Sequence, residues 1–153
     1  MRQLSTKNAA AMTQDCNCLA LREAARYVTQ HYDQYLVPTG LRATQFSIMA
    51  RLARKGPLTI NELAAELVMD RTTLGRNILP LERDGLIESR PGEHDRRRKE
   101  LRITQLGEEG LNTATGAWSK AQSSFESAFG PSRSQKLRSL LNAVVTTDLR
   151  GDE

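Results

Sequence analysis

The side chains best suited to recognise another molecule lie in one short stretch that follows Asp70. They are cationic, hydroxyl and amide groups close together in a predicted helix, namely Arg71, Thr72, Thr73, Arg76 and Asn77. Arginine can donate two hydrogen bonds to guanine, asparagine pairs with adenine, and threonine offers a hydroxyl and a methyl group to thymine. These residue types near the start of a helix are typical of base recognition in a DNA major groove.

A second concentration of cations lies on a predicted turn further along the chain. Residues 91–95 include proline, glycine and aspartate, which favour a tight reversal of the backbone. Cations on a projecting loop release counterions when they neutralise phosphates, and arginine also suits a narrow minor groove. A run of charges is usually only solvated surface, but a position directly after a helix pair favours nucleic acid. The cations of the turn are Arg96, Arg97, Arg98 and Lys99.

Two capped helices are predicted to position the first group. Thr59 and Glu62 have the spacing of a capping box at the start of one helix. After a turn at residues 68–69, Asp70 begins the next helix, where its carboxylate meets the positive end of the dipole. Gly85 then ends that helix in a left-handed conformation. The buried faces are predicted to be Leu63, Ala64 and Leu67 in the first helix and Leu74, Ile78 and Leu81 in the second.

Pro80 lies inside the second of these helices and removes one backbone hydrogen bond. We expect one bent helix, because the apolar face continues beyond the proline. Two short strands are predicted at residues 86–90 and 99–103. Helix, turn, helix and basic hairpin in this order predict a winged helix-turn-helix. The alternation in the second strand is predicted to point Leu101 and Ile103 inward and Arg102 outward.

Four further helices are predicted around this motif, from Asn17 to the Pro38 turn, over residues 44–54, after the cap Thr104, and from about Ser134. The first and the last are more apolar than a small winged domain could bury alone, which predicts a dimer surface. Two-fold symmetry would place two reading helices on successive major grooves. The predicted apolar faces are Cys18, Leu21, Ala25, Val28, Tyr32 and Tyr35; Phe46, Met49, Leu52 and Ala53; Leu111, Trp118, Phe125 and Phe129; and Leu137, Leu140, Leu141, Val144 and Val145.

The expected fold class is therefore mainly α with a small β wing. We expect a single domain over residues 1–153, with a winged-helix DNA-binding core at about 44–103. Dimerisation helices at about 17–37 and 104–150 would flank this core at its N- and C-terminal sides.

Composition limits the classes of function. The chain has 153 residues, a net charge of +4 and two cysteines. A moderate basic excess suits a polyanionic partner, although it also serves solubility. Residues 1–14 lack the apolar core of a signal peptide, and no stretch has the roughly 18 apolar residues that span a membrane. We expect a cytoplasmic protein without a disulfide framework, without a cofactor and without contact to a membrane.

Three segments resemble the MarR family of bacterial winged-helix regulators, and the resemblance extends over nearly the whole chain. It implies a homodimeric transcriptional repressor on a palindromic operator in double-stranded DNA. It also implies that Arg97 is the wing arginine and that Asp95 orients it through a salt bridge. Several members of the family have a proline where Pro80 falls. The segments are Asp70-Arg71-Thr72-Thr73-Leu74, Leu81-Glu82-Arg83-Asp84-Gly85-Leu86-Ile87, and Asp95-x-Arg97 with Leu101-x-Ile103-Thr104.

The signal that such a repressor senses has two candidate sites. The first is the pair Cys16 and Cys18 at the start of a helix, where the dipole stabilises the reactive thiolate. Organic hydroperoxide regulators of the family keep a reactive cysteine at about the place of Cys18, and Tyr32 matches one of their two tyrosines. Alternatively, Cys18 packs as a small buried hydrophobic residue. A zinc site that adds one histidine is disfavoured, because His31 and His94 are expected to lie far apart.

The second candidate is a pocket between the dimerisation helices and the winged domain. Small aromatic acids or phenols bind there in the larger part of the family and change the spacing of the two reading helices. Such a pocket needs apolar walls and a cation or hydrogen-bond donor. The residues that could supply these groups are Arg22, Arg26, His31, Tyr32, Phe46 and Met49.

Two other classes of function compete with a DNA-binding regulator. A winged helix can instead bind protein, but such interfaces favour apolar anchors over the exposed arginines after Asp70. An enzyme would need a nucleophile beside a base, a phosphate loop or metal-ligand spacing, and the sequence contains none of these patterns. The sequence therefore predicts a DNA-binding repressor that responds to an aromatic ligand or, alternatively, to an organic hydroperoxide.

Overall fold

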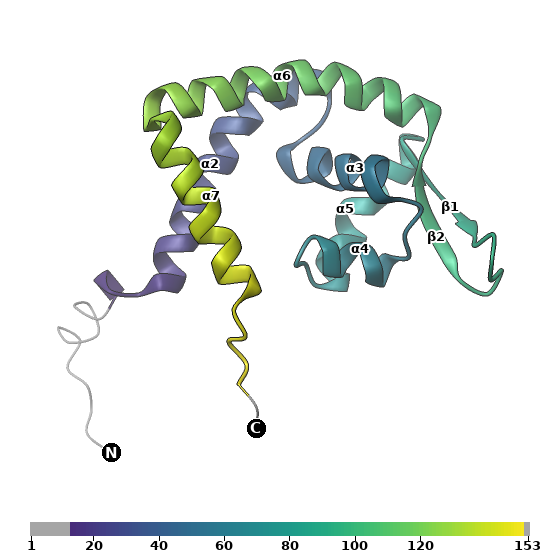
Figure 1. Cartoon of the computed structure of the whole chain (residues 1–153). Helices are drawn as coiled ribbons and strands as arrows, with labels where there is room; N and C mark the ends of the chain where they lie inside the picture. Colours follow the sequence, from purple (N-terminus) through teal and green to yellow (C-terminus); the bar gives the residue numbers. More distant parts are fainter. Residues whose placement is uncertain (1–12, 152–153) are drawn as a thin grey trace.

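The computed structural model describes residues 13–151, and most of the polar start expected at residues 1–14 lies outside them. The protein is mainly helical with one two-stranded antiparallel sheet, as predicted. Figure 1 shows α6 as a long bridge, with α2 and α7 towards one of its ends and the winged-helix elements towards the other. The elements are α2 (Asn17–Leu36), η1 (Val37–Thr39), α3 (Ala43–Lys55), α4 (Ile60–Glu66), α5 (Arg71–Arg83), β1 (Ile87–Pro91), β2 (Lys99–Ile103), α6 (Gln105–Phe129) and α7 (Pro131–Thr146).

The helix pair α4–α5 begins and ends where the caps were predicted. Thr59 Oγ1 accepts a hydrogen bond from the Glu62 amide, and the Glu62 carboxylate accepts one from the Thr59 amide. Asp70 caps α5 through the Thr73 amide, and Gly85 has a φ of 72°. The buried faces of both helices agree with the prediction except for Leu67, which is only half-buried.

One detail of the pair could not be read from local patterns, and one agrees with them. Val68 adopts a φ of 51° in the turn, a conformation that β-branched residues rarely take. Helix α5 runs unbroken through Pro80 to Arg83, which agrees with the prediction of a single helix.

The wing begins one residue later than predicted, because β1 covers Ile87–Pro91 and pairs Ile87 with Ile103. Leu58 adds an isolated bridge, in which it exchanges two backbone hydrogen bonds with Leu101. Arg102, predicted to point outward, is half-buried: its side chain is 25% exposed, and its Nε is buried without a hydrogen-bond partner in the described chain. Its Nη1 lies 3.9 Å from Oε1 of the exposed Glu93.

Helix α3 buries a wider face than the spacing of its apolar residues indicated. Ile48 is fully buried although the predicted set omitted it, whereas Ala53 is exposed. The reason is that α3 packs against four other helices and β2 at once. The core therefore centres on this helix, and it joins Met49 and Leu52 to Leu63, Leu74 and Leu81.

Helix α6 buries its small residues completely, whereas Leu111, Phe125 and Phe129 of the predicted stripe are only half-buried. Its buried residues are Gly107, Ala114 and Ala121, seven positions apart on one face, while Trp118 is 36% exposed. Small side chains let a helix approach its neighbours closely. At Gly107 the approach is extreme, because an added Cβ would lie 2.0 Å from the backbone oxygen of Leu86.

Helix α7 begins at Pro131, earlier than predicted, and packs mainly on α6. Ser134 is buried and donates a hydrogen bond from its hydroxyl to the Gly130 carbonyl. Most of the apolar residues predicted on one side of this helix are exposed in the single chain, namely Leu140, Leu141, Val144 and Val145. Of the helices among residues 13–151, none is long and apolar enough to cross a membrane.

Replacement of Gly107 by alanine should destabilise the fold by about 1–3 kcal/mol, because the new methyl group meets backbone that cannot turn aside. Gly116→Ala is the matched control in the same helix, since its Cβ would meet nothing within 4 Å. The control should stabilise by about 0.5–1 kcal/mol, as expected for glycine in a helix interior. Urea unfolding of both variants checks this. Similar midpoints for the two would contradict a close contact at Gly107.

Candidate nucleic-acid interface

The exposed face of α5 presents two kinds of side chain. Arg71, Thr72 and Arg76 are exposed, and neither arginine has a hydrogen-bond or ion-pair partner within residues 13–151. Thr73 and Asn77 are partly engaged by their own helix. The Thr73 hydroxyl donates to Asp70 Oδ2 at 2.5 Å, and Asn77 Nδ2 donates to the Thr73 carbonyl at 2.9 Å. Thus three of the five predicted base-reading side chains are free to bind.

Asp70 holds the start of this helix. Its Oδ1 also accepts the Thr73 amide at 2.8 Å. The hydrogen bonds from the Thr73 hydroxyl and then from its amide lower the pKa of the Asp70 carboxyl below its ordinary value. The carboxylate therefore stays ionised and fixes the first turn, from which Arg71 and Thr72 project.

The tip of the wing is closed by its own backbone. The Gly92 amide donates to the Arg98 carbonyl at 2.7 Å, and the Arg98 amide donates to the Asp95 carbonyl at 3.1 Å. Asp95 Oδ1 accepts the Arg97 backbone amide at 3.0 Å. The expected Asp95–Arg97 salt bridge is therefore absent from the described chain, and Asp95 instead braces the main chain of the loop.

Arg98 differs from the other cations of the wing because it joins the wing to the helix pair. Its Nη2 lies 2.6 Å from Glu62 Oε1, while Glu62 Oε2 accepts the Thr59 amide at 2.8 Å. The Thr59 amide is the largest cause, and the Arg98 hydrogen bond the next, of a lowered pKa for the Glu62 carboxyl. One carboxylate thus caps α4 and positions the wing.

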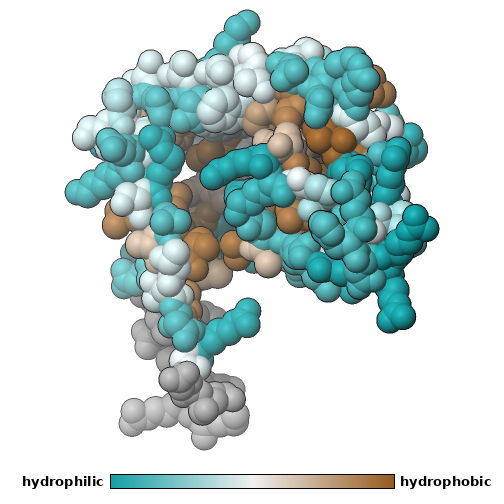
Figure 2. All heavy atoms as spheres, turned by 45° about the vertical axis from the view of Figure 1, so that its right-hand side comes forward, coloured by the Kyte–Doolittle hydropathy of each residue, from teal (hydrophilic) through white to brown (hydrophobic). Residues whose placement is uncertain are grey.

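The remaining cations of the wing are free. Arg96, Arg97 and Lys99 are exposed and make no side-chain hydrogen bond or ion pair with any residue that the structure describes. Figure 2 shows long hydrophilic side chains projecting from the winged-helix side of the molecule. Arg96, Arg97 and Lys99 of the wing and Arg71 and Arg76 of α5 together form what we call the free cation set.

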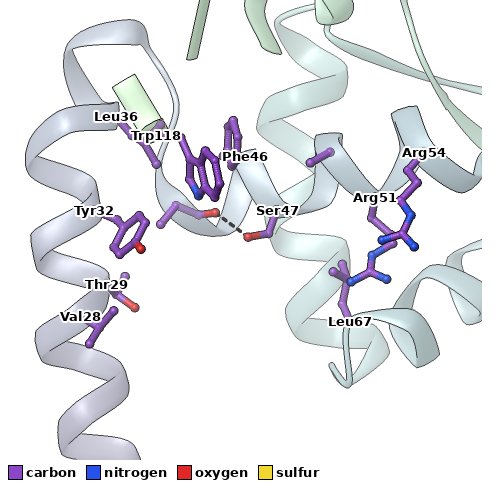
Figure 3. Close-up of a pocket in the computed structure, with 12 residues that line it drawn as sticks. Val28, Thr29, Tyr32, Leu36, Phe46, Ser47, Arg51, Arg54, Leu67 and Trp118 are labelled. Carbon is purple, nitrogen blue, oxygen red and sulfur yellow. Dashed lines mark hydrogen bonds between the residues drawn. The ribbon is translucent and has the colours of Figure 1, made fainter. Parts of the chain in front are cut away.

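A cleft of about 490 Å³ lies between α2, α3 and α6. Figure 3 shows its wall of aromatic and aliphatic side chains, with Arg51 and Arg54 at one end. The Phe46 and Trp118 rings lie nearly parallel, with an interplanar angle of 12° and centroids 6.2 Å apart. The lining residues are Val28, Thr29, Tyr32, Leu36, Ala43, Phe46, Ser47, Ala50, Arg51, Arg54, Leu67 and Trp118.

Only Tyr32 and Phe46 of the predicted ligand residues line this cleft. Met49 is fully buried in the core, while Arg22 and Arg26 are exposed on α2. Sequence reasoning missed Arg51, Arg54 and Trp118. A signal existed in the arginines, which are three positions apart on α3, but the fold alone brings Trp118 opposite Phe46.

His31 serves the packing of α2 on α6. Its Nε2 lies 3.1 Å from the Ala121 carbonyl, and its ring contacts Tyr32, Tyr35 and Phe125. The Tyr32 hydroxyl donates to Gln122 Oε1, and burial, followed by the charge of Glu126, raises the pKa of the tyrosine.

The two cysteines lie at the start of α2 as free thiols. Cys16 is the N-cap residue and half-buried, and Cys18 is exposed, so its expected burial is wrong for the single chain. The structural reason is that no other element of the described chain covers this end of α2. Cys18 and Tyr32 stand 14 positions apart on one helix, about 21 Å along its axis, which excludes a hydrogen bond between them within one chain. Within residues 13–151 no group of three histidine, cysteine or acidic side chains is arranged to hold a metal ion.

Acidification should weaken the helix pair through Glu62. The pKa of the Glu62 carboxyl is lower in the folded chain than in the unfolded chain, where it is about 4. Its contribution to stability is therefore present above the unfolded pKa and is lost as the pH falls through the folded pKa. We expect Glu62→Gln to flatten the pH dependence of the free energy of unfolding between about pH 5.5 and pH 3. Glu23→Gln on α2 is the control and should leave the slope unchanged. An equal slope in wild type and Glu62→Gln would contradict the role of this carboxylate.

Comparisons with known proteins agree with this geometry. Residues 41–99 match the model of the MarR family. The uncharacterized HTH-type transcriptional regulator YwoH of Bacillus subtilis (strain 168) is 32% identical over 88 residues, which are 58% of this chain and 64% of that protein. The match therefore spans less than two thirds of the length of that relative.

Solved structures extend the likeness over most of the chain. The transcriptional regulator MosR of M. tuberculosis in complex with DNA is 35% identical, with a TM-score of 0.73 and coverage of 88% of this chain and 99% of that one. CouR from Rhodococcus jostii RHA1, bound to p-coumaroyl-CoA, is 20% identical with a TM-score of 0.74, over 90% of this chain and 97% of that one, and shows the fold alone. Because the family model and the MosR relative both match, and because the fold is a winged helix-turn-helix, the chain belongs to the MarR family of DNA-binding transcriptional regulators, which are not enzymes.

Proposed function

We propose that this protein is a homodimeric transcriptional repressor that binds a palindromic operator in the bacterial cytoplasm. Helix α5 enters the major groove with Arg71, Thr72 and Arg76, and the wing sets Arg96 and Arg97 against phosphates or the minor groove. The observation that carries the proposal is the free cation set. Five cations without an internal partner in the described chain project from one helix-turn-helix and its hairpin, which is the electrostatic footprint of a duplex reader.

Thr73, Asn77, Asp95 and Arg98 have supporting roles in this proposal. The Thr73 hydroxyl donates its proton to Asp70 and can only accept from a base, whereas Asn77 keeps its Oδ1 and its second amide hydrogen for a base. Asp95 shapes the loop that presents Arg97, and Arg98 fixes the angle between wing and helix pair. Their replacement should therefore act through geometry more than through lost charge.

The dimer is supported by apolar surface that the single chain leaves uncovered. Leu19 and Leu21 on α2 and the four apolar residues of α7 named above are exposed at the side of the molecule away from the wing. Such a surface marks an interface, and a second copy related by two-fold symmetry would cover both helices at once. We assign residues 17–37 and 104–150 to this interface and residues 44–103 to DNA binding.

A small aromatic ligand in the cleft is the proposed signal for release. The cleft has a size suited to a small molecule, a parallel aromatic pair and two arginines. It lies between α2, which belongs to the proposed interface, and α3, which supports the helix pair. The solved structure of CouR with p-coumaroyl-CoA is of a protein with this fold and an aromatic ligand.

An organic hydroperoxide sensed by Cys18 is the second candidate signal. The observation that favours it is exposure, since the thiol lies open at the N-terminal turn of α2, next to the proposed dimer surface. Oxidation of the thiolate to a sulfenic acid would reduce the hydroperoxide to the alcohol. The new polar group would then lie where two copies of the chain must pack.

Selection of bound duplexes from a random DNA pool tests the main proposal. A symmetric dimer should enrich a palindrome with half-sites about one helical turn apart, and binding should weaken steeply as salt rises. Enrichment of an asymmetric site would contradict the dimer, and no enrichment would contradict sequence-specific binding altogether.

On the enriched duplex, Arg97→Ala and Arg76→Ala should fail in different ways. Arg97→Ala should weaken binding to all duplexes alike and reduce the salt slope by about one. Arg76→Ala should cost about 1–3 kcal/mol on the operator and relax the preference at one base position. Lys136→Ala, which removes an exposed cation from α7, is the charge-matched control. Anisotropy titrations at several salt concentrations give these values. The assignment is falsified if both arginine variants bind like the Lys136 control.

Cumene hydroperoxide should abolish operator binding of the wild type, reversibly on reduction, if Cys18 is the sensor. Cys18→Ser should then bind the operator normally and ignore the oxidant, because the reactive sulfur is gone. Cys16→Ser is the matched control for a general effect of thiol loss at this helix start. An oxidant response that persists in Cys18→Ser would rule out Cys18.

A further inference from the structure

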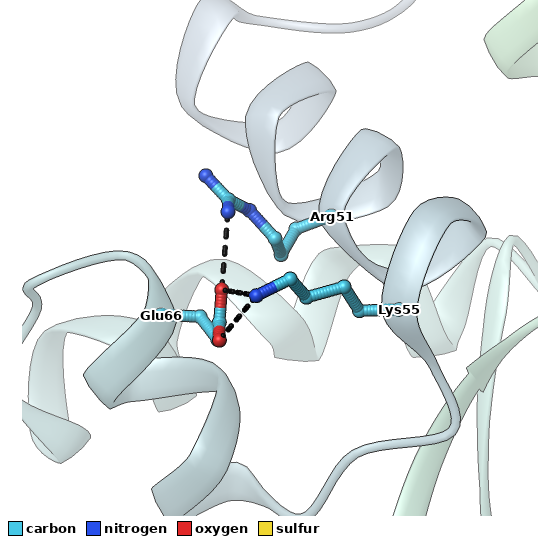
Figure 4. Close-up of polar contacts among 3 residues, drawn as sticks. All are labelled: Arg51, Lys55 and Glu66. Carbon is cyan, nitrogen blue, oxygen red and sulfur yellow. Dashed lines mark hydrogen bonds and ion pairs between the residues drawn. The ribbon is translucent and has the colours of Figure 1, made fainter.

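Arg51 belongs to two sites at once. It lines the cleft between α2, α3 and α6, and its Nη1 lies 3.0 Å from Oε2 of Glu66. Glu66 is the last residue of α4, the first helix of the DNA-binding pair. Figure 4 shows Arg51 and Lys55 reaching from α3 to this single carboxylate. A side chain of the cleft therefore holds the end of α4 directly.

Lys55 holds the same carboxylate from outside the cleft. Its Nζ lies 2.7 Å from Oε1 and 2.8 Å from Oε2 of Glu66, and it is not among the lining residues. The hydrogen bond from Lys55, followed by the charges of Lys55 and Arg51, lowers the pKa of the Glu66 carboxyl. Glu66 is thus an ionised acid between two cations. A ligand in the cleft can reach Arg51, which lines it, but not Lys55, which does not.

The lining of the cleft favours one class of ligand. Its cationic end consists of Arg51 and Arg54, and none of its lining residues is acidic. Its lining also includes the parallel pair of Phe46 and Trp118, which Figure 3 shows between the α2 residues and the arginines and which suits a flat ring. Arg54 has no ion-pair partner in the described chain, whereas Arg51 is already shared with Glu66. A planar aromatic molecule with one carboxylate therefore matches both the aromatic pair and the two arginines.

We propose that an aromatic carboxylate in this cleft competes with Glu66 for Arg51, and that occupation of the cleft thereby loosens α4 from α3. The effect on DNA rests on the proposed repressor function, whereas the competition for Arg51 does not. Arg51 is in this sense both a ligand-binding residue and the coupling residue between the cleft and the helix pair.

The physical basis is the preference of a guanidinium for paired contact with one carboxylate. Arg51 gives Glu66 a single nitrogen, so a ligand that accepts two parallel hydrogen bonds offers the stronger partner. The ligand also brings a second negative charge next to Glu66, which repels it. Lys55 still holds Glu66, so α4 is loosened rather than released. Because α4 leads into α5 through the turn at Val68, a shift of α4 changes the placement of the reading helix.

Trp118 makes the competition measurable without DNA, since it is the only tryptophan in the chain and lines the cleft. The probes are three carboxylates, benzoate, cinnamate and 2-naphthoate, each compared with its uncharged primary amide. Binding is followed by Trp118 fluorescence and verified by calorimetry. Three variants are compared with wild type: Arg51→Gln, Glu66→Gln and the control Lys55→Gln, which removes the cation that does not line the cleft.

Wild type should bind at least one carboxylate more tightly than its amide. Arg51→Gln should lose about fivefold to tenfold in carboxylate affinity and nothing in amide affinity. Glu66→Gln should bind the carboxylate about fivefold more tightly, because the internal competitor is gone. Lys55→Gln should show no such gain, since it leaves Glu66 free to hold Arg51. Unchanged carboxylate affinity in Glu66→Gln, equal losses for carboxylate and amide in Arg51→Gln, or no carboxylate bound at all would each overturn the proposal.

A separate titration of the enriched duplex tests the coupling to DNA. The bound carboxylate should weaken operator binding of wild type and leave that of Arg51→Gln unchanged at the same occupancy of the cleft. An equal effect on both proteins would overturn the coupling role of Arg51. A protein that binds no duplex would contradict the proposed repressor, while the fluorescence titrations would still decide whether carboxylate and Glu66 compete.

Discussion

The junction between the wing and α6 sets the arrangement of the whole chain. The Leu86 carbonyl accepts the Thr104 amide at 3.1 Å, the Thr104 hydroxyl donates to the Gly85 carbonyl at 2.6 Å, and the same hydroxyl accepts the Gly107 amide at 3.0 Å. The first turn of α6 therefore lies against the backbone that enters β1, at a distance that leaves no room for a side chain at Gly107. These contacts fix the direction in which α6 leaves the wing. That direction determines where α2 and α7 stand relative to the reading helix.

In the DNA-binding half, single side chains likewise connect two elements. Glu62 takes part in two structures at once, because it caps α4 and holds Arg98 of the wing. The charge of one wing arginine is thereby used inside the protein, and its neighbours Arg96 and Arg97 are left for a polyanion. Asp70 and Thr73 hold the start of α5 through two hydrogen bonds to each other, and Arg71, Thr72 and Arg76 are left exposed. The interface consists of side chains that the fold does not need for itself.

Glu66 plays the corresponding part on the other side of the helix pair. Its ion pairs with Arg51 and Lys55 bind α4 to α3 across a boundary that is only partly buried. Exposed ion pairs of this kind contribute little to stability, which makes them suited to exchange. A regulator must change shape at a small cost in free energy. The core of Leu63, Leu74 and Leu81 keeps the helix pair together, and the polar rim can adjust its position.

The sequence by itself determined the local elements. The caps at Thr59, Asp70 and Thr104 and the left-handed Gly85 were predictable, because each depends on residues no more than a few positions apart. The order of these elements was enough to predict a winged helix-turn-helix, and the family resemblance agreed with it.

Only the tertiary structure decided how the elements use their side chains. Arg98 lies 36 positions from Glu62, Arg51 lies 15 from Glu66, and Trp118 stacks on Phe46 from another helix. Periodicity predicts which face of a helix is apolar, but it does not say which neighbour covers that face. For this reason the alternative of a buried Cys18 is wrong for the single chain, where it is exposed, and Arg102 is half-buried although it was expected to point outward. Contacts between distant residues depend on the direction of α6, and a contact as close as that at Gly107 has no local signature in the sequence.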